Sequence, residues 1–102
     1  AVIADPARHL LIGHRQGKPI GVVRLDERDN TGEVSIYLTP DARGQNNGSV
    51  LLRAQEAWIR ATRPHITQLV AVVLGDNVAS RKLFLKNGYT CLPTHYEKRI
   101  TR

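Results

Sequence analysis

Cysteine is nearly absent from this sequence, and its single example, Cys91, leaves no partner for a disulfide within the chain. Cys91 and His95 can share one strand face, but two ligands do not make a zinc site, so we expect a buried, inert thiol and no metal. No apolar run approaches the about 18 residues of a membrane-spanning helix, and no signal segment is recognisable. The expected location is cytoplasmic, without a membrane partner.

Aromatic residues are also scarce, at 5% of the chain. Positive charge is not scarce: the net charge is +6, and residues 77–102 carry six Lys or Arg against one Asp or Glu. A basic segment attracts anions of any kind, including nucleic acid and a phosphorylated cofactor. Because single-stranded nucleic acid stacks on aromatic rings, we expect no nucleic-acid partner and keep a basic nucleic-acid-binding domain as the least favoured alternative.

Strand patterns dominate the first part of the chain. Two β-rich runs, residues 9–16 and 19–25, flank a turn at Gly17 and predict a hairpin. In residues 33–39, Val34, Ile36 and Leu38 alternate with polar residues, which predicts a strand with one buried face. Residues 67–74, TQLVAVVL, predict a central strand buried on both faces. Two further strands are expected at residues 89–92 and 94–101.

Two helices are predicted between these strands. In residues 47–62 an apolar stripe recurs at helical spacing through Val50, Ala54, Ala57, Trp58 and Ala61, and Leu51 and Leu52 widen it. Residues 78–86 predict a short helix, capped by Asp76 or Asn77 and closed by a left-handed residue in Asn87-Gly88. The order β-β-β-α-β-α-β-β predicts an α/β (α+β) fold with helices flanking a mixed, mostly antiparallel sheet, in a single domain over residues 1–102.

The most informative stretch is ARGQNNGSVLL, residues 42–52, where a loop after the third strand leads directly into the first helix. The first amides of a helix have no internal partner and carry the positive end of its dipole, so such a junction can bind phosphate. The loop offers residues that tolerate positive φ or close approach, a hydroxyl and a fixed charge: Gly44, Asn46, Asn47, Gly48, Ser49 and Arg43. A connecting loop that binds nothing has the same composition and stays an alternative.

Two segments, YLTPDARGQNNGSVLL (37–52) and NVASRKLFLKNGY (77–89), together resemble the GCN5-related N-acetyltransferase (GNAT) family. In that family a Q/R-x-x-G-x-G/A loop receives the pyrophosphate of acyl-coenzyme A, and an Asn-led helix ending in a glycine-aromatic pair lines the pantetheine side. The resemblance implies acetyl-CoA as co-substrate and the following cofactor-binding residues: Tyr37, Leu38, Thr39, Arg43, Gly44, Gln45, Asn46, Asn47, Gly48, Ser49, Asn77, Ser80 and Lys82.

The sequence departs from the family pattern in two ways. Asn46 replaces the first motif glycine and is expected to adopt positive φ, and Asn47 replaces an aliphatic residue, which removes an apolar contact beneath the loop. The resemblance begins at the family's second strand, so its opening strand and pair of helices are missing. We therefore expect either a longer protein or cover for the sheet from another source, such as a homodimer or a fused domain.

The resemblance also implies a reaction, in which a primary amine of a small molecule or protein directly attacks the thioester of acetyl-CoA. The oxyanion donor corresponds to a backbone amide of residues 37–39. Glu33 is the predicted base, although a strand bulge would reverse its face. Phe84 stands where many members carry tyrosine, so Tyr89 is the predicted acid, with Tyr96 as a second possibility. A CoA-binding module without catalysis is the main alternative.

Overall fold

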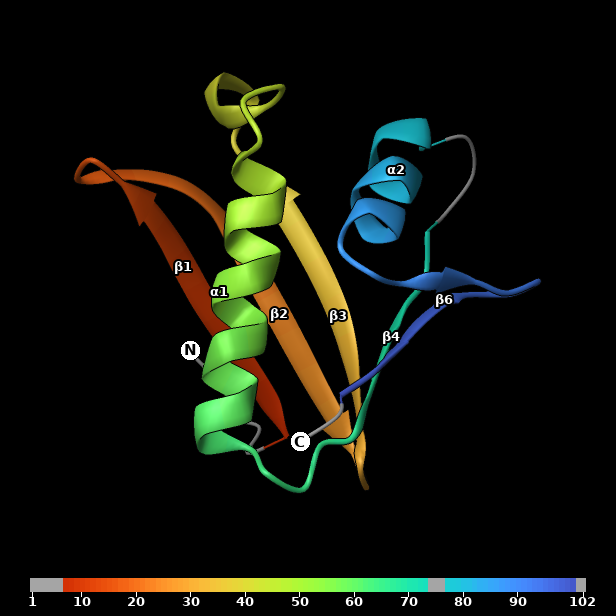
Figure 1. Cartoon of the computed structure of the whole chain (residues 1–102). Coiled ribbons are helices and arrows are strands. Elements are labelled where there is room, and N and C mark those ends of the chain that lie inside the picture. Colours follow the sequence, from red (N-terminus) through yellow and green to blue (C-terminus); the bar gives the residue numbers. More distant parts are fainter. Residues whose placement is uncertain (1–6, 74–76, 101–102) are drawn as a thin grey trace.

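The structure is a computed structural model that describes residues 7–73 and 77–100. Two helices flank a mixed sheet (Figure 1), which confirms the predicted fold class. A short 3₁₀ helix that was not predicted, η1, opens the loop after the third strand. The elements are β1 (Arg8–Arg15), β2 (Lys18–Arg28), β3 (Thr31–Leu38), η1 (Pro40–Ala42), α1 (Asn47–Thr62), β4 (Gln68–Ala71), α2 (Val78–Lys86), β5 (Thr90–Cys91) and β6 (Tyr96–Arg99).

The strands form one sheet in the order β1-β2-β3-β4-β6-β5. All neighbours are antiparallel except β3 and β4, which run parallel and pair only over residues 31–33 and 68–70. Beyond that point the two strands diverge, and α2 lies on the β4 side (Figure 1). Within the described residues, the upper part of β3 therefore has no strand partner on this edge.

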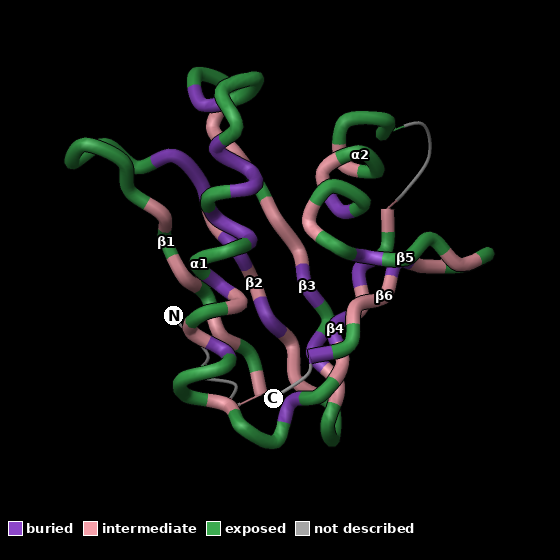
Figure 2. Tube along the Cα trace, viewed as in Figure 1, coloured by how far each residue is buried: buried purple, intermediate pink, exposed green. Residues whose placement is uncertain are grey.

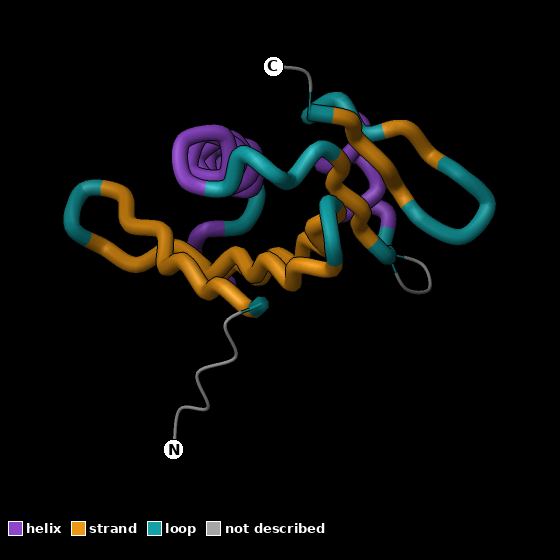
Figure 3. Tube along the Cα trace, turned by 90° about the horizontal axis from the view of Figure 1, so that it is seen from below, coloured by secondary structure: helices purple, strands orange, loops and turns teal. Residues whose placement is uncertain are grey.

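Helix α1 covers one face of β1, β2 and β3, as the end-on view in Figure 3 shows. Its buried face differs from the predicted stripe, because Val50 is 38% exposed and Ala54 and Ala57 are also exposed. The residues that face the sheet from the middle of the helix are Leu51, Leu52, Gln55 and Ile59. Leu51 and Leu52 of the predicted stripe are buried and Trp58 packs against the core, but alanine is too small for its spacing to fix the buried face of a helix, so the rest of the stripe was misplaced.

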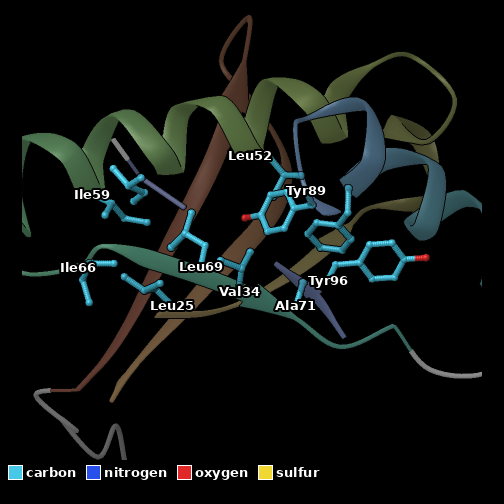
Figure 4. Close-up of a cluster of buried hydrophobic side chains, with 11 residues drawn as sticks. Leu25, Val34, Leu52, Ile59, Ile66, Leu69, Ala71, Tyr89 and Tyr96 are labelled. Atoms are coloured by element: carbon cyan, nitrogen blue, oxygen red, sulfur yellow. The ribbon is translucent and has the colours of Figure 1, made fainter. Parts of the chain in front are cut away.

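The main hydrophobic core lies between α1 and the sheet and extends to α2 (Figure 4). It joins Leu25 and Val34 of the central strands to Leu52 and Ile59 of α1. A smaller cluster of Ile20, Val23, Ala42 and Leu51 lies under the loop that follows β3. Burial is concentrated where α1 crosses β2 and β3 and where β4 meets β6 (Figure 2). The start of α1 thus packs on the smaller of the two hydrophobic clusters.

Strand β4 is shorter and less buried than predicted. It covers Gln68–Ala71 with alternating burial, and Val72 is 52% exposed, while Leu74 lies outside the described residues. The physical reason is the departure of β3, which removes the neighbour that would have covered the far end of β4. The apolar run of residues 67–74 therefore does not indicate a strand buried on both faces, because Val72 lies beside the separation of β3 and β4.

On the sheet face opposite α1, Leu10 and Ile12 of β1 are 61% and 63% exposed. In the part of the chain that the structure describes, no helix has the length and apolarity to cross a membrane.

Glu27, near the end of β2, ties together three parts of the fold. Its carboxylate accepts hydrogen bonds from His9 of β1 and from His65, which follows α1, and the Arg63 guanidinium lies 3.1 Å away. The ring of His9 packs against Trp58 of α1 with centroids 5.3 Å apart. Burial acts to raise the pKa of Glu27, but the hydrogen bonds and charges of His65 and His9 outweigh it and hold this pKa below its usual value.

The Glu27→Gln substitution should lower the free energy of unfolding by about 2 kcal/mol near neutral pH. A lowered pKa means that the ionised carboxylate is favoured in the fold. Its contribution is therefore full above the unfolded value near 4.5 and is lost as the pH falls through the lower folded value. Urea unfolding near pH 7 and near pH 3 measures both. Asp29→Asn, at an exposed turn residue with φ of 57°, is the matched control; an equal loss from Glu27→Gln at both pH values would contradict this assignment.

Candidate functional site

A cavity of about 520 Å³ opens between the end of β3, the start of α1 and helix α2. It brings together eleven of the predicted cofactor-binding residues: Tyr37, Leu38, Arg43, Gly44, Asn46, Asn47, Gly48, Ser49, Asn77, Ser80 and Lys82. Three lining residues were not singled out from the sequence: Ile36, Ala79 and Leu83. The remaining one, Lys86, is one of the C-terminal cations that the sequence offered as partners of the cofactor's phosphates, and it lies on the same helix as Lys82, one turn further along.

The two remaining predicted residues support the loop from outside the cavity. Thr39 donates its amide (3.0 Å) and its hydroxyl (3.4 Å) to the carbonyl of Ile20, and the side-chain amide of Gln45 donates to the carbonyl of Asp41 (3.1 Å). Thr39 and Gln45 hold the loop in place but do not line the cavity. The Thr39 amide, already hydrogen-bonded, is not available as an oxyanion donor.

The loop backbone has the predicted left-handed conformation at Asn46 but not at Asn47, which is instead the first residue of helix α1. Gly44 has φ of 77° in open space, and Asn46 has φ of 62°, in the left-handed region expected of it. Asn46 is also the N-cap residue of α1, yet its side chain makes no capping hydrogen bond. Its carbonyl accepts the first helical bond, from Val50 at 3.3 Å. The amides of Asn47, Gly48 and Ser49 therefore have no hydrogen-bond partner within the described residues.

Asn47 ties the loop to the body of the protein. Its side chain is buried, donates to the carbonyl of Ala42 (3.0 Å) and accepts from the Arg15 guanidinium (2.6 Å). In place of the apolar contact that an aliphatic residue would make, Asn47 makes two polar contacts. They join η1, the start of α1 and the β1–β2 hairpin. Sequence alone could not show this, since Arg15 lies 32 positions away.

Helix α2 is fixed against the first turn of α1. Asn87 donates its side-chain amide to the Ser49 hydroxyl (3.0 Å), and Lys86 donates to the side-chain oxygen of Asn46 (2.8 Å). A Cβ at Gly48 would lie 2.9 Å from a methyl of Leu83, so glycine permits this close approach.

Both ends of α2 follow the prediction. The side chain of Asn77 caps the first turn by accepting from the Ser80 amide (3.1 Å), and Gly88 has φ of 90° beyond the last turn. The other predicted cap, Asp76, lies outside the described residues.

The open edge of β3 offers backbone groups to the cavity. Thr39 bonds to Ile20 of β2, and such bonds alternate along an antiparallel pair. Every second residue of β3 therefore directs its N–H and C=O to the other edge, namely Gly32, Val34, Ile36 and Leu38. Gly32 and Val34 flank Glu33, the last residue of β3 paired with β4, whereas Ile36 and Leu38 lie beyond the paired segment. Of the predicted oxyanion donors in residues 37–39, only Leu38 has its amide on this edge.

Tyr89, the predicted acid, lies away from the 520 Å³ cavity. It is 6% exposed, packs edge-on against Phe84 and lines a separate cavity of about 200 Å³. Burial and the nearby Glu56 carboxylate raise the pKa of its hydroxyl, which makes it a weaker acid than an exposed tyrosine. The geometry therefore gives no support to Tyr89 as a proton donor. Tyr96 is also buried, on the far side of Phe84.

Glu33, the predicted base, lies at the last paired position of β3, opposite Val70 of β4. The β2–β3 register is continuous, so no bulge changes its face, and its exposed side chain lies on the opposite face from buried Val34. It lines a third cavity, of about 320 Å³, together with Asp26 and Asp29. No hydrogen bond or ion pair holds its carboxylate within the described residues.

Cys91 is exposed in β5, which corrects the expectation of a buried thiol. Among residues 7–73 and 77–100, no three His, Cys, Asp or Glu side chains gather into a group that could hold a metal ion.

Comparison with known proteins identifies the family to which this chain belongs. The model of the acetyltransferase (GNAT) family matches residues 2–89. The chain belongs to the GNAT family. A Bacillus subtilis (strain 168) relative named "Putative phosphinothricin acetyltransferase YwnH" is 36% identical, and the match covers 76% of this chain and 56% of that one. The family resemblance inferred from two short segments is thereby confirmed.

Two solved structures share the GNAT fold. The GNAT domain of S. lividans PAT has a TM-score of 0.81 at 24% identity, covering 92% of this chain and 61% of that chain. RimL, a ribosomal L7/L12 alpha-N-protein acetyltransferase in complex with coenzyme A, has a TM-score of 0.82 at 18% identity, covering 93% and 63%. This chain thus spans between 56% and 63% of the length of the relatives named here.

The Asn47→Leu substitution should destabilise the protein by about 2 kcal/mol, because it leaves the Ala42 carbonyl and the Arg15 guanidinium without their partner. Gln45→Ala, which removes one exposed hydrogen bond from the same loop, should cost less than about 0.5 kcal/mol. Urea unfolding of the two variants checks the difference. Equal stabilities would show that Asn47 does not anchor the loop.

Proposed function

We propose that this chain is an N-acetyltransferase that moves the acetyl group of acetyl-CoA to a primary amine by direct attack. The observation that carries the proposal is a single cavity where unpartnered helix amides, cationic side chains and an open strand edge meet. These three features suit the pyrophosphate, the charge of the phosphates and the amide-containing pantetheine arm. Family membership and the coenzyme A complex of RimL support the same ligand.

The first turn of α1 would hold the pyrophosphate. Its unpartnered amides carry the positive end of the helix dipole, and Lys82 and Arg43 contribute charge from two other elements. The Arg43 guanidinium lies over the ring of Tyr37, 5.9 Å from its centroid, which holds this charge at the cavity wall. Anion binding here uses main chain and cations in combination.

The open edge of β3 would pair with the pantetheine arm as an added strand does. Leu38 lies next to the loop, whereas Ile36 lies two residues further from the pyrophosphate and still lines the cavity. The thioester is at the far end of the arm, so we assign the oxyanion donor to the amide of Ile36 rather than to residues 37–39. This amide is on the open edge of β3, and because it is a backbone group, its role does not depend on the side chain of residue 36.

Acetyl-CoA supplies an activated thioester, whose carbonyl carbon bonds to the amine nitrogen while the C–S bond breaks and a thiolate leaves. Glu33 would accept the proton that the amine loses. It lies three residues from Ile36, about 10 Å along the strand, which exceeds direct hydrogen-bond reach and requires a water relay. Water also protonates the thiolate, since Tyr89 lies in another cavity.

The acceptor is an amine of a small molecule or protein. Asp29 and Glu33 bring negative charge to the 320 Å³ cavity beside the strand separation. Arg28 also lies there, and Asp26 is paired with Arg8 and Arg24. The carboxylates of Asp29 and Glu33 would attract an ammonium group. YwnH and RimL carry different acceptors in their names, so membership in the family does not define the amine.

Acetyl-CoA should bind the chain measurably by calorimetry, and Lys82→Ala should weaken that binding about fivefold, the effect of ~1 kcal/mol. Arg99→Ala, which removes the same charge from exposed β6, is the matched control and should leave affinity unchanged. Absence of binding to the unaltered chain would refute the proposed function. Binding without thiol release in the presence of a panel of amines would instead support a CoA-binding module without catalysis.

The Glu33→Gln substitution should lower kcat about 100-fold, because it removes the proton acceptor, and should leave acetyl-CoA affinity unchanged. Thiol release at saturating amine measures the rate. Asp29→Asn, in the same cavity, is the control for a general loss of negative charge. A rate that falls equally in both variants would assign Glu33 to electrostatic attraction of the amine and not to proton transfer.

A further inference from the structure

The N-cap of α1 shows an unusual choice of partner. An asparagine in this position normally accepts hydrogen bonds from the amides of the first turn, which it caps. Asn46 does not: its backbone is left-handed (φ 62°), whereas a residue that caps with its side chain is typically extended, and its side-chain oxygen accepts from the Lys86 ammonium on α2 at 2.8 Å. Both residues line the 520 Å³ cavity.

The consequence for anion binding is direct. A side-chain oxygen that capped α1 would occupy the position of a phosphate oxygen and compete with it for the amides of Gly48 and Ser49. A motif glycine cannot compete in this way, because it has no side chain. The side-chain oxygen of Asn46 can therefore compete with a phosphate oxygen for these amides, and the contact with Lys86 keeps it away from them.

The lysine is held where it can do this. Asn87, the next residue, is hydrogen-bonded to Ser49 of α1, and Leu83 packs on Gly48. These contacts fix the last turn of α2 against the first turn of α1. The charge-assisted hydrogen bond from the Lys86 ammonium adds to the left-handed backbone of Asn46, and both favour the arrangement in which Asn46 does not cap α1.

We propose that Lys86 is a positioning residue for acyl-CoA: it holds the side chain of Asn46 off the first turn of α1 and so keeps the phosphate-binding amides exposed. The inference rests on the proposed function for its ligand, but the capping equilibrium belongs to the ligand-free chain. Lys86 acts through Asn46, in contrast to Lys82 and Arg43, which act through their charge.

A double-substitution cycle on acetyl-CoA binding tests this. Lys86→Met should weaken binding about tenfold in the unaltered background. In the Asn46→Gly background, where no capping side chain exists, the same substitution should change affinity less than about twofold. Lys82→Met is the control and should cost the same in both backgrounds. In turnover, Lys86→Met should raise KM for acetyl-CoA and leave kcat and KM for the amine unchanged.

Two results would overturn the proposal. A cost of Lys86→Met that persists with Asn46→Gly would make Lys86 a direct phosphate ligand, and an unchanged affinity in the single variant would deny it any role. Amide hydrogen exchange without ligand gives an independent measurement: Lys86→Met should protect the amides of Gly48 and Ser49, which Asn46 then caps. Unchanged exchange would refute the positioning role of Lys86, whether or not the chain binds acetyl-CoA. A failure to bind acetyl-CoA would refute only the proposed function.

Discussion

The separation of β3 from β4 is the constraint on which the rest of the structure depends. Three residue pairs join these parallel strands, and beyond them each strand follows its own neighbour. The separation leaves room for α2 beside the first turn of α1, and it exposes main-chain groups that a continuous sheet would have bonded internally. Backbone groups without partners are costly in a protein interior, so they lie where solvent or a ligand can reach them.

The loop between β3 and α1 combines rigidity with unused binding capacity. Buried Asn47 and Ser49 are hydrogen-bonded to distant parts of the chain, which restrains the loop without occupying its amides. Three cations, Arg43, Lys82 and Lys86, line the cavity at the positive end of a helix dipole. Arg43 and Lys82 bring their charge to this end of the cavity, whereas the Lys86 ammonium is hydrogen-bonded to the side chain of Asn46.

Local signals in the sequence predicted the order of elements and the positive φ of Asn46, because turn chemistry and strand alternation depend on neighbouring residues. Most of the cavity lining was predicted from the resemblance of two segments to the GNAT family. Part of the buried face of α1 and the extent of β4 were mispredicted. Both depend on which element packs against them in the fold. Gln55 is an example, because it is a polar residue of α1 that is nevertheless buried. The contact between Lys86 and Asn46, 40 positions apart, and the edge orientation of Ile36 required the register and the helix packing to be known.

The Asn47-Gly48 sequence at the start of α1 links chemical ageing to the integrity of the loop. Asparagine followed by glycine loses its side-chain amide most readily, by attack of the glycine nitrogen on the carboxamide carbon. Here the carboxamide is buried and held by Ala42 and Arg15, and the helix fixes the backbone around it. Deamidation of Asn47 therefore requires local opening of this segment, and an aspartate there would set a carboxylate oxygen against the Ala42 carbonyl in place of the amide that now donates to it.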